Sequence, residues 1–204
     1  MDLSYLSERF VNQIKNIAGE SADELAYLAA TGKIEDFIRD KLAYRVLNEK
    51  ASFPEIRYVA KNDWPETFGK NTKTRRIDIV AYNEKAEPEF CIELKSANTD
   101  TEKSIEHVKR HQKNLEEQIN DITLRPCIGI FLGVHPAPEN DSAFSEEKDP
   151  SIKYHRPATR QKRNELKEGF SNLFKDPPVE IPIGIYKGIP IFLLVACLQP
   201  EKRR

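Results

Sequence analysis

The stretch RRIDIVAY at residues 75–82, followed by FCIELKS at residues 90–96, decides both the fold and the site. Each segment is an apolar run typical of a strand, and each carries an acid where an interior strand ordinarily has none. Apolar residues flank Asp78 and Glu93, so strand alternation predicts that both carboxylates project from the face opposite the apolar one. Lys95 lies two positions after Glu93 and shares its face. If the strands pair, two acids and one ammonium gather, and such a local exception usually marks a site.

Apolar periodicity assigns the elements around these two segments. Spacings of three and four predict helices, whereas alternation or continuous apolar runs predict strands. We expect helices at 3–18, 21–31, 33–48, 102–121 and 158–174, and further strands at 54–61, 127–134, 181–186 and 189–198. The strand, helix, strand order formed by 90–96, 102–121 and 127–134 suggests a βαβ crossover, so part of the sheet should be parallel. The fold class is therefore α/β, a mixed sheet flanked by helices with an N-terminal helical segment and a C-terminal hairpin.

Length and composition favour one globular domain. The chain has 204 residues, of which 39% are hydrophobic and 32% charged, enough to bury a core beneath a charged surface. We expect a single domain over 1–204, with its core at 33–134 and a loop, helix and hairpin over 135–204. The polar stretch 135–157 predicts a long excursion, functional or mobile.

The cysteines and the hydropathy of the chain indicate the cellular compartment in which the protein is expected. Three unevenly spaced cysteines lie in apolar runs, which favours reduced, buried thiols in a cytoplasmic protein: Cys91, Cys127 and Cys197. The longest apolar stretch is far shorter than the ~20 residues that a membrane helix needs. Membrane insertion is therefore not expected.

The acids and the lysine fit metal-dependent phosphodiester chemistry. Asp78 and Glu93 offer the hard oxygen ligands that Mg²⁺ prefers, with Mn²⁺ as a substitute, and the carbonyl of Leu94 could add a third oxygen. Lys95 could orient or activate the attacking water. The histidines show no ligand spacing with cysteine, and we interpret the pair His107 and His111 as solvated.

Asp78 together with Glu93-Leu94-Lys95 resembles the PD-(D/E)XK nuclease superfamily, in which an acid on one strand is followed by E-x-K or D-x-K on the next. The match looks closest to restriction endonucleases, including the N-terminal nuclease domain of type I restriction subunits, although Ile77 stands where the motif's name has proline. The resemblance implies a restriction-endonuclease-like fold and Mg²⁺-dependent hydrolysis of DNA. It also implies a homodimer, because cutting both strands of a symmetric site needs two active sites related by a two-fold axis. A cognate methyltransferase is the further partner that it suggests.

Two supporting residues follow from the same resemblance. Relatives often place an extra acid on the helix before the first strand, where Glu35 and Asp36 are adjacent. At ~100° per residue, Glu35 lies on the apolar side of that helix and Asp36 points toward solvent, so Glu35 is the predicted catalytic acid. The alternative is that both acids merely complement the helix macrodipole. Gln112, on the helix after E-x-K, is a weaker candidate for a supporting role.

A nucleic-acid partner requires cations that follow phosphates. Two basic groups qualify, one directly before Asp78 and one near the start of the later helix: Lys73, Arg75 and Arg76, and Arg156, Arg160 and Arg163. Arginine suits both phosphate oxygens and guanine edges. The alternative for each residue is a solvated helix face.

Two other functions remain open from the sequence. The same centre would serve DNA repair, recombination or RNA cleavage. In a non-catalytic nucleic-acid-binding module, Asp78, Glu93 and Lys95 would form only a structural salt bridge, and no metal would be needed.

Overall fold

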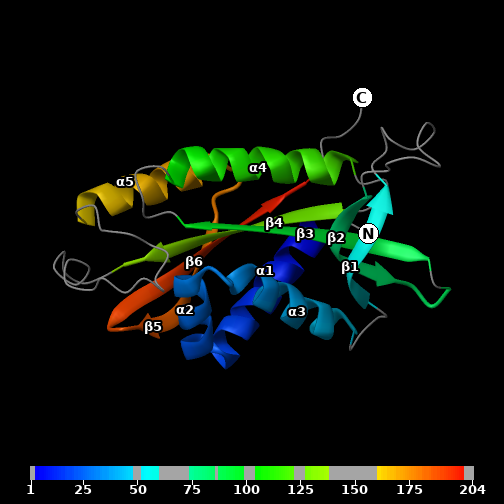
Figure 1. Cartoon of the computed structure of the whole chain (residues 1–204), viewed down its shortest axis with the longest axis horizontal. Coiled ribbons are helices and arrows are strands. Elements are labelled where there is room, and N and C mark those ends of the chain that lie inside the picture. The colour runs from blue at the N-terminus through cyan, green and yellow to red at the C-terminus, as the bar shows by residue number, and fades with distance from the viewer. Residues whose placement is uncertain are drawn as a thin grey trace.

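A mixed β-sheet with helices on both faces forms the centre of the molecule (Figure 1). The computed structural model describes residues 3–47, 52–59, 74–85, 87–98, 104–121, 127–137 and 160–199. Within these ranges, six strands form one sheet in the order β1-β2-β3-β4-β6-β5. The helices are α1 (Leu3–Glu20), α2 (Ala22–Thr31), α3 (Ile34–Leu47), α4 (Ser104–Asp121) and α5 (Arg160–Ser171). The strands are β1 (Ser52–Val59), β2 (Thr74–Tyr82), β3 (Pro88–Asn98), β4 (Cys127–Pro136), β5 (Val179–Tyr186) and β6 (Ile189–Leu198).

The α/β class and the mixed sheet predicted from the sequence are confirmed. β3 and β4 are parallel and α4 connects them, as the predicted crossover requires. The other neighbouring strands in the described sheet are antiparallel. The predicted excursion lies outside the described residues from residue 138 onward.

Two short connections are set by backbone conformations that follow from their residues. Gly32 ends α2 with a φ of 72°, and the N–H of Lys33 donates to the carbonyl of Leu28 at 2.8 Å, which closes the helix and starts α3 two residues later. Lys187 and Gly188 join β5 to β6 with φ values of 50° and 77°. Both are positive, as a type I′ hairpin turn requires.

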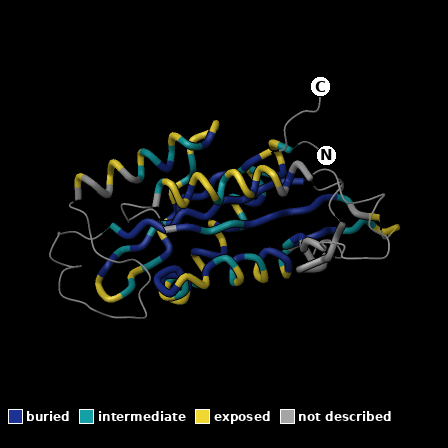
Figure 2. The backbone as a smooth tube through the Cα atoms, turned by 45° about the horizontal axis from the view of Figure 1, so that its top comes forward, coloured by how far each residue is buried: buried dark blue, intermediate teal, exposed yellow. Residues whose placement is uncertain are grey.

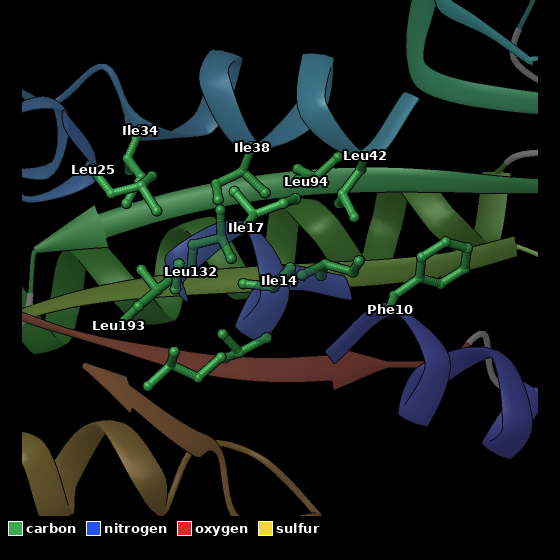
Figure 3. Packing of buried hydrophobic residues seen from close by; sticks show 14 of the residues in the cluster. Phe10, Ile14, Ile17, Leu25, Ile34, Ile38, Leu42, Leu94, Leu132 and Leu193 are labelled. Atoms are coloured by element: carbon green, nitrogen blue, oxygen red, sulfur yellow. The ribbon is translucent and has the colours of Figure 1, made fainter. Parts of the chain in front are cut away.

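Two apolar clusters pack on opposite faces of the sheet. The first lies beneath α1, α2 and α3, where Phe10, Ile14 and Ile38 pack toward Leu94 and Leu132 of the central strands (Figure 3). The second lies beneath α4 and α5 and contains the ring cluster of Phe131, Phe170 and Phe174. The central strands are consequently buried along most of their length (Figure 2).

This double coverage also buries the acidic part of the sheet. Strand alternation predicts that Glu93 projects from the face of β3 opposite Ile92 and Leu94, and Cys91 and Ala97 on that face are buried in the second cluster. Glu93 lies between them and is only 3% exposed. The reason is that a strand inside a helix-covered sheet has no solvated face, so an acid there is buried whichever way it points.

The described helices were also compared with the requirements of a membrane span. None of them is both long enough and apolar enough to cross a bilayer.

Candidate active site

β2 and β3 separate at the two acidic residues. Their described pairing ends with Ile79 opposite Ile92. Beyond that pair, β2 continues beside β1, whereas β3 continues beside β4. Asp78 and Glu93 are the next residues on each strand, so both lie where the sheet forks.

Each carboxylate at the fork accepts a hydrogen bond from a main-chain N–H of the opposite strand. Leu94 N–H donates to Asp78 Oδ2 at 2.7 Å, and Asp78 N–H donates to Glu93 Oε2 at 3.3 Å. The side chains satisfy donors that strand pairing would otherwise use, and this holds both acids at the opening. The N–H and C=O of a strand residue point to the same edge, so the carbonyl of Leu94 faces the fork as well.

The first turn of α3 brings a third carboxylate to the fork. Glu35 Oε1 lies 3.3 Å from Lys95 Nζ, and Glu35 Oε2 accepts a hydrogen bond from Ser96 N–H at 2.6 Å. The side chains of Glu35 and Lys95 are 29% and 27% exposed, whereas that of Asp36 is 74% exposed and pairs with Arg39. Glu35, and not Asp36, is therefore the acid that faces the sheet, as the helical periodicity predicts.

Burial sets the protonation of the two acids at the fork. Burial and, after it, the neighbouring Asp78 carboxylate raise the pKa of Glu93 to about 8, against the smaller lowering effects of Lys95 and of the hydrogen bond from the Asp78 N–H. The pKa of Asp78 is also raised, chiefly by burial, against the lowering effects of the Leu94 N–H and the Lys95 ammonium. Lys95 thus does not neutralise the pair, and the site retains an excess of buried acidic groups.

The same cluster of carboxylates stabilises the charged form of Lys95. Burial alone lowers the pKa of its ammonium, but the carboxylates of Glu35, Glu93 and Asp78 outweigh burial and raise the pKa above its ordinary value. Lys95 is therefore a cation at neutral pH, held by Glu35 at the more accessible side of the buried acids.

The donor set fits a hard divalent cation. Two carboxylates and a main-chain carbonyl supply oxygen only, and Mg²⁺ keeps several of its waters, so it needs no larger protein cage. Among the residues that the structure describes, no three His, Cys, Asp or Glu side chains are grouped as a metal site, which a closed zinc centre would require. A site formed by Asp78, Glu93 and the carbonyl of Leu94 would accordingly be open, with positions left for water and phosphate oxygens.

Gln112, the predicted supporting residue, is not brought to this cluster. Its amide nitrogen donates to the carbonyl of Leu173 at 2.8 Å and to Glu116 Oε1 at 3.1 Å. The first bond ties α4 to the segment that follows α5, and the second lies within α4. The hydrogen bonds described for Gln112 are therefore structural ones.

Two of the six predicted nucleic-acid contacts fall outside the described parts of the chain, and the side chains of the other four are not described. Lys73 and Arg156 are not described, and Arg75 and Arg76 are placed only as residues of β2. Arg160 and Arg163 belong to the first turn of α5, which lies on the same side of the sheet as α4 (Figure 1); their side chains are not described. Their role in binding nucleic acid stays a prediction.

Two neighbours of the site were not assigned to it from the sequence, Arg39 and His111, the second of which the sequence predicts to be solvated. The positive charge of Arg39, on α3, lowers the pKa of Asp78. His111, on α4, lies within electrostatic reach of both Lys95 and Glu35, which shift its pKa in opposite directions. A signal for Arg39 was its position four residues after Glu35, one turn along the same helix face.

The site combines hard oxygen ligands with the Lys95 ammonium, which Glu35 holds beside them, and the side chains of this pair are partly exposed to solvent. It is suited to binding a divalent metal together with an anionic substrate. No protein-family model, curated protein or solved structure matches the chain in the three comparisons with known proteins.

Proposed function

We propose that this chain is a Mg²⁺-dependent endonuclease that hydrolyses DNA phosphodiester bonds, with a restriction-endonuclease-like fold. The observation that carries the proposal is the convergence of Asp78, Glu93 and Lys95 where β2 and β3 separate, in the order of the PD-(D/E)XK motif. Glu35 supports it, because an acid from the preceding helix reaches the motif lysine.

The residues of the site divide the work of hydrolysis. When bound, Mg²⁺ supplies charge neutralisation at the phosphate and lowers the pKa of a coordinated water. Asp78 and Glu93, which lie on the two strands at the fork, would hold the cation together with the carbonyl of Leu94. Lys95 orients the attacking water or the scissile phosphate with its ammonium group. Glu35 keeps the Lys95 side chain in that direction and preserves its charge.

Electrostatics favours metal binding over a purely structural ion pair. In a structural pair, the ammonium would stabilise the carboxylates as anions and lower their pKa values. Here burial and mutual repulsion outweigh Lys95, and the pKa values of both Asp78 and Glu93 are raised. A divalent cation would displace the proton of Glu93 and stabilise both carboxylates as anions, which Lys95 alone does not do.

A non-catalytic module is the second candidate, and one observation favours it. Each carboxylate already has a hydrogen-bond partner in the protein, so the cluster is partly satisfied without a metal. In that function the chain would bind nucleic acid, and the acids would only hold the fork and α3 together.

Substrate and assembly are part of the proposal. DNA is favoured by the resemblance of the motif to restriction enzymes, and DNA repair, recombination or RNA cleavage would use the same centre. A homodimer would place two such centres on the two strands of a symmetric site. The basic residues of β2 and α5 are the proposed phosphate contacts.

A cleavage assay with matched variants tests the function. Purified protein is incubated with supercoiled plasmid and with RNA, in Mg²⁺ and in EDTA, beside Asp78→Asn and Glu93→Gln. We expect DNA cleavage only with Mg²⁺ and its loss in both variants, with discrete fragments for a site-specific enzyme and a smear for a non-specific one. Cleavage that persists in both variants would overturn the assignment. Retained binding without any cleavage would support the non-catalytic module.

A further inference from the structure

Two histidines meet on one face of α4, beside the acidic cluster but separate from it. His107 and His111 are four residues apart, so they lie one above the other on the helix. Their rings are 4.3 Å apart between centroids, and the two Nε2 atoms are 2.5 Å apart. This contact has no part in the function proposed above.

At this short distance the two Nε2 atoms cannot both present a bare lone pair to each other. Ordinary hydrogen bonds to nitrogen donors span about 2.7–3.2 Å between heavy atoms. Two neutral imidazoles that each present a lone pair would repel at 2.5 Å, so either a proton or a metal cation must join the two Nε2 atoms. The proton gives a single hydrogen bond, and the metal gives a chelate.

The helix spacing suits the chelate. Histidines at positions i and i+4 on one helix face supply two zinc ligands in H-E-x-x-H helices. At a Zn–N length of ~2.05 Å and a tetrahedral angle, the two nitrogens would be roughly 3.3 Å apart. The pair therefore has to open by less than about 1 Å, a movement available to rotation of His107, which is exposed.

Burial decides which nitrogen of His111 is available. Its Nδ1 is buried and has no hydrogen-bond partner among the described residues. An ion from solvent can thus reach His111 only through Nε2, the atom that faces His107.

We propose that His107 and His111 form a binding site for a borderline transition-metal ion, with Zn²⁺ as the representative, distinct from the proposed Mg²⁺ site. Imidazole nitrogen suits Zn²⁺, Cu²⁺ and Ni²⁺, whereas Mg²⁺ requires oxygen, so the two sites would select different metals. Waters complete the coordination, because no third His, Cys, Asp or Glu joins the pair within the described ranges.

The charges around the pair act in both directions. Burial, His107, Arg110 and Lys95 lower the pKa of His111, and Glu35 raises it. Metal binds the neutral form of imidazole. The positive charges of Arg110 and Lys95 oppose an arriving cation, so binding should be reversible and not structural.

Calorimetric titration tests the site on untagged protein freed of metal with a chelator. Zn²⁺ is added to the wild type, to His107→Ala, to His111→Ala and to His155→Ala, which removes a histidine elsewhere. We expect the wild type and His155→Ala to bind Zn²⁺ alike, and each variant of the pair to bind at least about tenfold more weakly. Millimolar Mg²⁺ should not displace the ion, and imidazole nitrogen NMR should show Zn²⁺ shifting both Nε2 resonances.

Three results would overturn the inference: unchanged Zn²⁺ affinity in His107→Ala, displacement of Zn²⁺ by Mg²⁺, or loss of binding in Asp78→Asn. The first means that the two imidazoles share only a proton, and the other two place the ion at the carboxylates. Because His107 is exposed, its variant should fold even if His111→Ala does not. None of these readouts depends on cleavage, so the inference stands or fails apart from the nuclease proposal.

Discussion

Glu35 is joined to Ser96 across 61 residues of sequence, by a 2.6 Å hydrogen bond from the Ser96 N–H to Glu35 Oε2. The other oxygen of the same carboxylate holds Lys95. One side chain of α3 thus fixes both the main chain of β3 and the ammonium at the fork. α3 therefore acts as a brace for the site as well as a cover for the sheet.

Replacing Glu35 by alanine should destabilise the fold and reduce cleavage. Both hydrogen bonds are lost, and bonds to charged groups are worth roughly 1.5–3 kcal/mol each before partial exposure is discounted. Asp36→Ala is the matched control, because the neighbouring carboxylate is 74% exposed and its ion pair should contribute less than about 1 kcal/mol. Urea unfolding measures both. Equal destabilisation by the two variants would contradict the bracing role.

Lys95→Met should lower the cleavage rate by about 10²–10⁴-fold, the range for removing a group that orients or activates the attacking water. The substitution should also shift the alkaline limb of the pH–rate profile to higher pH. The reason is that the Lys95 ammonium lowers the pKa of Glu93, and its loss raises that pKa further. Lys113→Met is the control, since Lys113 is exposed on α4 and pairs only weakly with Glu117. A pH–rate profile for each variant checks the prediction. A uniform loss of rate with no shift in the profile would argue for a merely structural lysine.

Much of the candidate site could be predicted from local pattern. Asp78, Glu93 and Lys95 stand out because each breaks the apolar pattern of its strand, and Glu35 is separated from Asp36 by the 100° turn of a helix. The elements and the parallel β3–β4 pair follow from the same periodicities. These are properties of short segments, which sequence alone displays.

The rest depends on contacts between distant segments. Whether the Glu93 face is covered depends on where α4 packs. The alternation of residues within β3 does not show the position of that helix. Gln112 bonds to Leu173, 61 residues away, which no local pattern indicates. The electrostatic link between His111 and Lys95 is of the same kind. The strand alternation therefore predicts which residues share a face, but not what covers that face.

The basic residues of α5 should contribute to the salt dependence of DNA binding. Each phosphate contact adds about one unit to the slope of log K against log salt, so Arg160→Ala with Arg163→Ala should reduce the slope by about two units. Fluorescence anisotropy over a series of salt concentrations measures it. A slope equal to that of the wild type would mean that neither arginine contacts phosphate.

Packing between β4 and α5 gives a prediction about the fold alone. A Cβ at Gly133 would lie 2.6 Å from Cζ of Phe170, whose ring is held between Phe131 and Phe174. Gly133→Ala should therefore cost roughly 1–3 kcal/mol of stability through overpacking. Gly19→Ala is the control, because a Cβ there meets nothing within 4 Å and α1 should gain up to about 1 kcal/mol. Thermal unfolding should shift in opposite directions for the two variants.

The pH dependence of stability should reverse when Mg²⁺ is added. The pKa of Glu93 is about 8 in the folded protein and 4.5 when unperturbed, so between these values the folded state binds the extra proton. In EDTA, this contribution to stability is fully present below the unperturbed pKa and is lost as the pH rises toward 8, with a slope of at most about 1.4 kcal/mol per pH unit. In Mg²⁺, the ionised carboxylates bind the cation, and the gain in stability from metal should increase with pH.

Urea unfolding at several pH values, in EDTA and in Mg²⁺, measures both slopes on the same protein. Glu93→Gln cannot ionise at this position, so its stability should be flatter with pH in EDTA and should gain little from Mg²⁺. The two slopes separate the two candidate functions. If stability declines with pH in EDTA and Mg²⁺ does not restore it, Glu93 is a buried acid that binds no metal, as the non-catalytic module predicts. Recovery that depends on Glu93 would instead place the cation at the fork between β2 and β3.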